Sequence, residues 1–487
     1  MTERDGPQLI AYADRLAGDL RGLTALLDGP LADAFAGVHV LPFFTPIDGS
    51  DAGFDPDDHT AVDPRLGDWD DVAKLAGGRH VMADLICNHV SDRSPRFRDW
   101  LTRGSASRYD GMFLTRESVF GPDPDQADLD RITRPRPGRP FTPVTLADGS
   151  THHLWTTFTP QQVDIDVQHP QGRAYLESIL DRFAANGITQ VRLDAVGYCV
   201  KTAGTSCFLT AETYAFVDEL SGWCAERGLS VLVEVHAHWT QQVEIAGRVD
   251  RAYDFALPPL LLHVLHGGDP TPLARWLVER PTNVVTALDT HDGIGVRDVA
   301  PGPAGPGLLD EDQVDALVES VHEATGGTSR LATGASASNV DLYQVNATFL
   351  SALGGDHDAL YAARTVQVLL KGTPQVYYVG LLHGADDAEL LGSTGVGRDV
   401  NRHRYTPDEV DASLASAPVR RLLRLLALRR DHPAFDGTCT VRCDGPVVAI
   451  DWEHDGRTVA ARVDLHARSV EVEVDGRVRD ELTVGPR

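Results

Sequence analysis

The chain has 487 residues, more than one small core needs, so we expect a large catalytic domain with inserted or appended parts. Its 71 acidic side chains outnumber its 44 basic ones and give a net charge of -27, so we expect no nucleic acid and no membrane surface as a partner. Residues 1–9 are polar and unlike a secretory signal, and no apolar stretch is long enough to span a membrane, so we expect a cytoplasmic protein.

Short apolar runs alternate with helical patterns along most of the chain, as is typical of parallel strands joined by crossover helices. Each run is rich in Val, Ile or Leu and ends in polar residues. The eight runs are residues 8–14, 37–44, 81–88, 190–196, 231–236, 251–257, 283–289 and 375–380. Eight strand–helix units predict an α/β protein built on a closed (β/α)8 TIM barrel, whose functional side chains lie at the C-terminal ends of its strands.

Two long stretches interrupt this alternation. The first follows strand 3, and its Pro- and Arg-rich centre at residues 134–140 excludes a single crossover helix. The second follows strand 7 and contains residues 301–307, rich in Pro and Gly, and residues 325–338, rich in Gly, Ser and Ala, which we expect to be irregular loops. We therefore predict loop-rich domains inserted after strands 3 and 7, which form walls of the site.

The end of the chain predicts a separate unit. A helix is expected at about residues 417–430, and beyond residue 435 the apolar pattern has period two, with Asp-Gly turns, which indicates a small antiparallel β-domain. The predicted division is a barrel of residues 1–88, 170–292 and 356–434, inserted domains of residues 89–169 and 293–355, and a C-terminal β-domain of residues 435–487.

Polar residues gather at four of the predicted strand ends. They are Asp84, Asn88 and His89 on strand 3, Arg192 and Asp194 on strand 4, Glu234 and His236 on strand 5, and Asp289, His291 and Asp292 at the end of strand 7. Residues two apart on a strand share a face, so we expect Arg192 with Asp194, and Glu234 with His236, to converge on one pocket.

Asp194 and Glu234 are expected to differ in protonation. The Arg192 cation lowers the pKa of Asp194, which suits a nucleophile. Glu234 emerges from an apolar run, where desolvation favours the protonated form and suits a general acid. Retaining glycoside chemistry uses such a pair about 5–5.5 Å apart, and Asp292 would hold sugar hydroxyls. Taken singly, an Asp after Arg on a strand is more often a salt bridge at a barrel mouth, and a Glu in an apolar strand is sometimes only a paired buried acid.

In this order the four segments resemble the conserved motifs of the α-amylase family, glycoside hydrolase family thirteen. Residues 8–14, 41–46, 51–56, 158–166 and 341–346 resemble the sucrose phosphorylase branch of that family, over almost the whole chain. The resemblance implies Asp194 as nucleophile, Glu234 as acid/base and Asp292 as transition-state stabiliser. It also implies a glucosyl site of Asp51, Phe54, His89, Phe158, Arg192, Tyr198 and His291. The implied acceptor site contains Pro135, Arg136, His236, Asp341, Leu342, Tyr343, Gln344 and Arg398.

The implied reaction is retaining transfer of glucose from sucrose to phosphate, giving α-D-glucose 1-phosphate and D-fructose. Phosphorolysis of sucrose 6′-phosphate or glucosylglycerol, hydrolysis and transglucosylation stay open, and so does a non-catalytic barrel, which the full carboxylate set argues against. Independently, Arg134, Arg136 and Arg139 on a Pro-stiffened loop suit a phosphate dianion, although a solvated surface loop would also explain them.

We expect no cofactor and no metal. Asn88 resembles a calcium-ligand position of amylases, but the sucrose phosphorylase branch does not depend on calcium. The six scattered cysteines predict free thiols rather than a disulfide framework or a zinc site. The resemblance implies small-molecule substrates and a homodimer.

Overall fold

The computed structural model describes residues 6–49, 51–136, 138–335 and 344–485. Eight parallel strands close into a barrel in the order β1-β16-β13-β12-β11-β10-β5-β2, which confirms the predicted TIM barrel. The strands are β1 (Gln8–Ala11), β2 (Gly37–Val40), β5 (His80–Ile86), β10 (Gln190–Asp194), β11 (Ser230–Val233), β12 (Arg251–Tyr253), β13 (Val284–Thr286) and β16 (Thr373–Tyr377). Each strand ends before the predicted run does, so most of the polar residues at the barrel mouth lie on loops.

The barrel interior combines hydrogen-bonded polar side chains with buried apolar ones such as Met82, Leu232 and Val285, while the alternate positions of each strand pack outward against helices. Gln8 joins three strands, because its Nε2 donates to Gln190 Oε1 at 2.7 Å and its Oε1 accepts from Gln375 Nε2 at 2.8 Å. Tyr253 OH donates to Gln375 Oε1 at 3.0 Å. These hydrogen bonds close the barrel interior below its mouth. The site lies above them, at the mouth itself.

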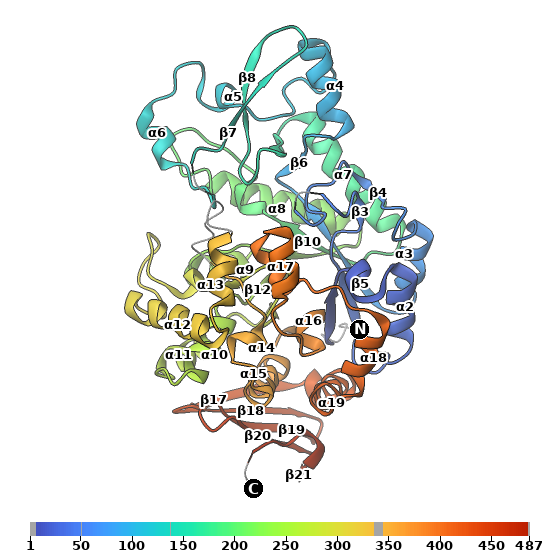
Figure 1. Ribbon diagram of the computed structural model, residues 1–487, viewed down its shortest axis with the longest axis vertical. Coiled ribbons are helices and arrows are strands. Elements are labelled where there is room, and N and C mark those ends of the chain that lie inside the picture. Colours follow the sequence, from blue (N-terminus) through green and yellow to red (C-terminus); the bar gives the residue numbers. More distant parts are fainter. Residues whose placement is uncertain (1–5, 50, 137, 336–343, 486–487) are drawn as a thin grey trace.

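Helices surround the barrel, as Figure 1 shows. They are α1 (Ala13–Ala17), α2 (Leu20–Asp28), α3 (Trp69–Leu75), α7 (Pro170–Ala185), α8 (Ala211–Glu226), α9 (Trp239–Ala246), α10 (Leu257–Leu265), α11 (Thr271–Glu279), α15 (His357–Leu369), α16 (Tyr378–Leu381), α18 (Pro407–Ala415) and α19 (Ala417–Asp431). The last of these confirms the helix predicted at residues 417–430.

The insertion between β5 and β10 forms the upper lobe of Figure 1. It contains β6 (His89–Ser91), α4 (Pro95–Arg103), α5 (Arg116–Phe120), α6 (Gln126–Arg131), β7 (Phe141–Thr145), β8 (Thr151–Trp155) and β9 (Gln162–Asp164). β6 pairs with β9 and β7 with β8, both antiparallel, so this stretch is not a single crossover helix, as predicted. A further pair, β3 (Phe44–Thr45) and β4 (Asp58–Val62), lies between β2 and β5.

The second insertion, between β13 and β16, is more helical than expected. Its elements are β14 (Ile294–Gly295), η3 (Arg297–Val299), α12 (Glu311–Ala324), α13 (Thr328–Ala335), β15 (Gln344–Val345) and α14 (Phe349–Ala352). The prediction of an irregular loop at residues 325–338 is wrong for α13, because Ala332 is buried against Leu391 and Val400 and tertiary packing overrides the local Gly and Ser signals. α17 (Ala388–Thr394) and η5 (Gly397–Asn401) follow β16. The inserted-domain boundaries given above stay a proposal.

The C-terminal unit is a five-stranded antiparallel sheet in sequence order, as predicted. Its strands are β17 (Thr438–Asp444), β18 (Val447–His454), β19 (Arg457–Asp464), β20 (Ser469–Val474) and β21 (Arg477–Val478). Asp455 and Asp475 have positive φ and precede glycines, as hairpin turns require. The sheet packs at the lower end of Figure 1, away from the barrel mouth, and Trp452 Nε1 donates to Leu369 O at 2.6 Å.

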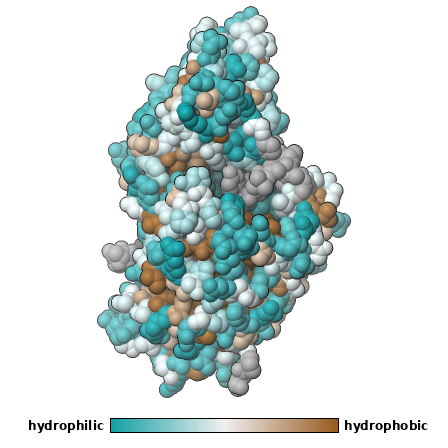
Figure 2. Space-filling model, turned by 90° about the vertical axis from the view of Figure 1, so that its left-hand side faces the viewer, coloured by the Kyte–Doolittle hydropathy of each residue, from teal (hydrophilic) through white to brown (hydrophobic). Residues whose placement is uncertain are grey.

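The face shown in Figure 2 is mostly hydrophilic, with small scattered apolar patches. Of the helices that the structure describes, none has the length and apolarity needed to cross a bilayer.

Candidate active site

A cavity of about 700 Å³ opens at the C-terminal mouth of the barrel. Most of the residues expected in the site line it: Asp51, Phe54, His89, Pro135, Arg136, Phe158, Asp194, Tyr198, Glu234, His236, His291, Asp292, Gln344 and Arg398. Arg192 lies on β10 and is buried. It contacts two of the carboxylates that line the cavity, those of Asp194 and Glu234. Asp341, Leu342 and Tyr343 lie outside the described residues.

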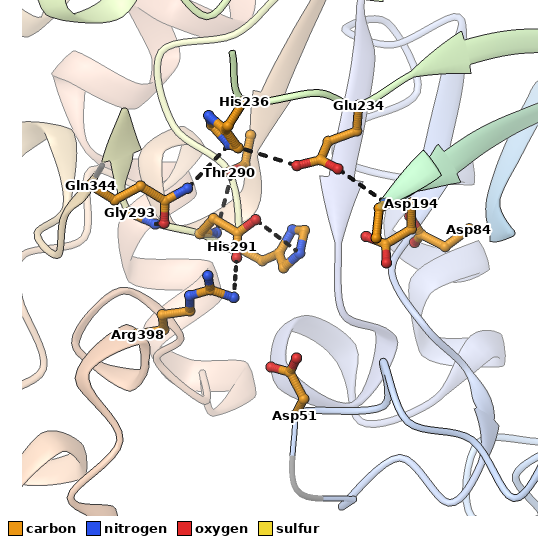
Figure 3. A network of polar contacts seen from close by, with 12 residues as sticks. Asp51, Asp84, Asp194, Glu234, His236, Thr290, His291, Gly293, Gln344 and Arg398 are labelled. Carbon is orange, nitrogen blue, oxygen red and sulfur yellow. Dashed lines mark hydrogen bonds and ion pairs between the residues drawn. The ribbon is translucent and has the colours of Figure 1, made fainter. Parts of the chain in front are cut away.

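The guanidinium of Arg192 joins three carboxylates (Figure 3 shows the acids). Its Nη1 lies 2.5 Å from Asp84 Oδ1 and 2.9 Å from Asp194 Oδ1, and its Nη2 lies 3.9 Å from Glu234 Oε1. The Oε2 atom of Glu234 accepts from the Ala195 amide at 3.3 Å, because Ala195 adopts a left-handed conformation directly after β10. Asp194 and Glu234 therefore share one cation at the floor of the cavity.

The expected lowering of the Asp194 pKa is wrong. Burial raises the pKa of Asp194 well above its ordinary value and outweighs Arg192, and the carboxylates of Glu234 and Asp84 raise it further. Despite burial, His39 and Arg192 hold the pKa of Asp84 below its usual range.

The surroundings of Glu234 also differ from the prediction. β11 ends at Val233, so strand alternation does not place Glu234 and His236 on one face, and the apolar run does not enclose the carboxylate. The loop after β11 still brings them together, because Glu234 Oε1 lies 3.7 Å from His236 Nε2. The Glu234 carboxylate has polar neighbours and faces the same space as Asp194 in Figure 3.

Asp292 is an ionised carboxylate held by arginines. Its Oδ1 lies 2.8 Å from Arg398 Nη1 and 4.0 Å from Arg402 Nη2. Despite burial, the cations Arg398 and Arg402 keep the pKa of Asp292 far below its ordinary value. Burial lowers the pKa of His291 to about 3, so this ring is neutral at ordinary pH and can hydrogen-bond a hydroxyl. Asp289 does not join them and instead pairs with Arg364 at 2.7 and 2.8 Å.

Aromatic rings form one wall of the cavity. Phe54 stacks on His291, with ring centroids 4.6 Å apart and planes inclined by 7°. Phe158 meets Tyr198 edge to face at 5.5 Å, and His89 lies 5.6 Å from Phe158. Flat apolar faces beside carboxylates are suited to a sugar ring, which presents C–H groups on one side and hydroxyls at its edge.

Of the three arginines expected to bind phosphate, Arg136 lines the cavity and the other two do not. Arg134 donates to the carbonyls of Thr157 at 3.0 Å and Arg139 at 2.9 Å, so it holds the loop together. Arg139 pairs with Asp130 at 2.8 Å on an exposed surface. The three side chains therefore do not form one phosphate site.

One group of side chains has the residue types of a metal site. Glu234, His236 and Asp292 each bring one polar atom within 4.8 Å of the others. His236 Nδ1 and Asp292 are already bound to Asp298 and Arg398, respectively. Both groups therefore already have partners within the chain.

Comparison with known proteins decides the family. The model of the α-amylase catalytic domain matches residues 4–240. Sucrose phosphorylase of Agrobacterium vitis is 56% identical, with 91% of each chain covered, and sucrose phosphorylase of Bifidobacterium adolescentis is 51% identical, with 91% of this chain and 89% of that one covered. The chain belongs to the α-amylase family. A crystal structure of sucrose 6F-phosphate phosphorylase from Thermoanaerobacter thermosaccharolyticum has a TM-score of 0.89 and 33% identity, and the match covers 100% of this chain and 99% of that one.

In this member of the α-amylase family, a lysine lies beside the residue that resembles a calcium ligand. Asn88 Nδ2 donates to Asp164 Oδ2 at 2.9 Å and to Tyr198 O at 3.0 Å. The ammonium of Lys201 lies 2.8 Å from Asp164 Oδ2, 3.1 Å from Thr157 Oγ1 and in contact with Tyr198 O. The cation at the junction between the barrel and the first insertion is therefore the ammonium group of Lys201.

Sequence reasoning missed Gln162, Lys201 and Asp298 of this α-amylase site, and it named Asp84 without giving it a role. Asp84 anchors Arg192, and its signal was an acid within an apolar strand. Gln162 donates to Asp51 Oδ2 at 3.3 Å and contacts His89 at 3.0 Å. Lys201 lies on an irregular segment and Asp298 on the short helix η3, and no periodic pattern marks them.

Proposed function

We propose that the chain transfers glucose from sucrose to phosphate, with retention, to give α-D-glucose 1-phosphate and D-fructose. The observation that carries the proposal is the pair Asp194 and Glu234, bound to one guanidinium at the floor of a cavity that also presents Asp292. The two relatives named sucrose phosphorylase support the choice of substrate.

In the first step, Asp194 attacks the anomeric carbon of the glucosyl unit while the bond to the fructosyl oxygen breaks. Glu234 gives its proton to that oxygen, and fructose leaves. Because the pKa of Asp194 is raised, the pair of carboxyls keeps a proton to higher pH than an ordinary aspartate would. The productive form carries this proton on Glu234 and leaves Asp194 as the anion. Arg192 stabilises that anion.

In the second step, a phosphate oxygen attacks the same carbon, the bond to Asp194 breaks, and Glu234 takes the acceptor's proton where one is present. Two inversions give net retention. Asp292 would hold hydroxyls of the ring as positive charge develops, and Phe54 and Phe158 would support its faces. On the acceptor side, Arg136, His236 and Gln344 line the space that phosphate would enter.

A second candidate is phosphorolysis of sucrose 6′-phosphate. The likeness to the solved sucrose 6F-phosphate phosphorylase favours it, but the identity to that protein is 33%, against 56% and 51% for the sucrose phosphorylases. Glucosylglycerol stays a further alternative donor.

The test offers sucrose, sucrose 6′-phosphate and glucosylglycerol separately, each with and without phosphate. Glucose 1-phosphate is measured enzymatically, and its anomer is assigned by NMR. We expect sucrose to give the highest kcat/KM and α-glucose 1-phosphate to appear together with fructose. Equal release of fructose with and without phosphate would identify a hydrolase or transglucosylase. The Asp194→Asn variant, purified in the same way, is the control for contaminating activity.

We further propose that the enzyme works in the reducing cytoplasm, which the free cysteines Cys87, Cys199, Cys207, Cys224, Cys439 and Cys443 support. The homodimer stays a prediction that light scattering would test.

A further inference from the structure

A buried carboxylate lies behind the acceptor-side histidine. His236 Nδ1 lies 3.1 Å from Asp298 Oδ2, and the Asp298 side chain is only 2% exposed. Asp298 Oδ1 accepts from Gln242 Nε2 at 3.0 Å, so both oxygens are engaged. The carboxylate therefore fixes Nδ1 of His236 as an N–H donor and turns Nε2 away from itself.

The packing around this pair leaves little room for movement. The His236 ring stacks on Phe255 at 4.0 Å, with planes inclined by 14°. A Cβ at Gly295 would lie 2.2 Å from Asp298 Oδ2 and 3.2 Å from His236 Nδ1, so this glycine is required by the close approach of the carboxylate.

The charges around His236 come from three directions. Asp298 on η3, Glu234 after β11 and Asp292 after β13 are the acids that face it, while Phe255 and Gln344 are neutral. The nearby cations Arg192 on β10 and Arg398 on η5 pair with Asp194 and Asp292. Burial alone would lower the pKa of His236, but these carboxylates raise that pKa to about 9.

Among the residues that the structure describes, none offers the far side of the ring an acceptor within hydrogen-bond distance. Gly293 N–H donates to Gln344 Oε1 at 3.2 Å, which turns the Gln344 amide nitrogen toward His236 Nε2 at 3.1 Å. Two N–H groups cannot donate to each other, and Glu234 Oε1 at 3.7 Å is beyond hydrogen-bond distance. A protonated Nε2 thus needs an acceptor from the cavity, and a phosphate oxygen supplies one.

We propose that Asp298 is a positioning residue for the second half of the reaction: through His236 it presents a cationic N–H donor to the incoming phosphate beside Glu234. The inference rests on the proposed function. It predicts that the negative charge of Asp298 favours phosphate over water or a neutral alcohol as the acceptor, without assisting departure of fructose.

The kinetic test is Asp298→Asn, which keeps the shape and removes the charge. We expect KM for phosphate to rise about tenfold or more, as for loss of a charged hydrogen bond, while kcat/KM for sucrose with glycerol as acceptor changes less than about threefold. The cationic form of His236 is lost as pH rises through its pKa, so the alkaline limit of kcat/KM for phosphate should move to lower pH in the variant. In a His236→Gln background, Asp298→Asn should add little further loss.

A second test does not depend on turnover. The imidazole Cε1–H signal of His236, assigned by its absence from His236→Gln, is titrated by NMR in the wild type and in Asp298→Asn. We expect titration near pH 9 in the wild type and at least about one unit lower in the variant. Gly295→Ala should reproduce both effects by displacing the carboxylate, whereas Gly222→Ala on α8, where a Cβ meets nothing within 4 Å, should not.

Equal losses with phosphate and glycerol, or an unchanged His236 titration, would overturn the role of Asp298. A wild-type enzyme that makes no glucose 1-phosphate would overturn the proposed function, and this inference with it, whatever the titration shows.

Discussion

Arg192 Nη1 lies 2.9 Å from Asp194 Oδ1, and the Arg192 side chain is 3% exposed. The same guanidinium also contacts Asp84 on β5, at 2.5 Å. The buried Asp84–Arg192 pair therefore holds a cation directly under the proposed nucleophile, where solvent does not screen it. Asp194 and the sugar carbon would react against this fixed charge.

Asp194→Ala should abolish turnover of sucrose because no other carboxylate on β10 reaches the anomeric carbon. We expect kcat to fall by at least about 10⁴-fold, the scale of losing a nucleophile. Thermal melting monitored by circular dichroism should stay cooperative, since Arg192 keeps its partner Asp84. Near-normal activity in a folded variant would remove Asp194 from the nucleophile role.

The pH profile for sucrose should show the raised pKa of Asp194. The nucleophile reacts only when ionised, so activity is lost as pH falls through that pKa. The acid limit of kcat/KM for sucrose should therefore lie well above the ordinary aspartate value of about 4. Arg192→Met removes the cation that opposes the raised pKa and should move this limit to higher pH. Arg192→Lys keeps the charge and serves as the comparison, and identical limits in the two variants would contradict the argument.

Glu234→Gln should separate proton donation from the rest of the site. The amide cannot protonate fructose, so kcat for sucrose should fall by about 10²–10⁴-fold, the usual contribution of a general acid. α-Glucosyl fluoride needs little protonation of its leaving group and should retain much more activity. Rates of fluoride and fructose release are compared in the same preparation. Equal losses on both substrates would mean that Glu234 does not act as the acid.

The fold was largely predictable because its signals are local and repeated. All eight barrel strands come from apolar runs that end in polar residues, and the C-terminal sheet comes from period-two patterns with Asp-Gly turns. The C-terminal ends of the strands were predicted too far along the chain. Polar residues at the mouth of a barrel do not mark the last residue that hydrogen-bonds to a neighbouring strand. α13 was missed because its stability depends on the burial of Ala332 against Leu391 and Val400, residues distant in sequence.

Much of the cavity lining could be predicted from the sequence, but its electrostatics could not. Asp194, Glu234 and Asp292 line one cavity, as the motif order implied. The pKa of Asp194 was predicted in the wrong direction, because a sequence shows the neighbour Arg192 but neither the burial of Asp194 nor the competing Asp84. Asp298 contacts His236 across 62 positions of sequence, and that pairing depends on how the segment after β13 folds against the loop after β11.

Lys201→Met should destabilise the junction between the barrel and the first insertion. The Lys201 and Asp164 side chains are 1% and 0% exposed, so the change leaves a buried carboxylate without its cation. Breaking such a pair costs about 3–5 kcal/mol of the free energy of unfolding, although Asn88 still donates to Asp164. Urea unfolding followed by tryptophan fluorescence measures the loss.

The matched control is Arg173→Met. The bond between Arg173 and Glu219 joins side chains that are 35% and 39% exposed, so it should contribute no more than about 1 kcal/mol to the free energy of unfolding. Equal, small effects of both substitutions would show that Lys201 does not hold the junction together.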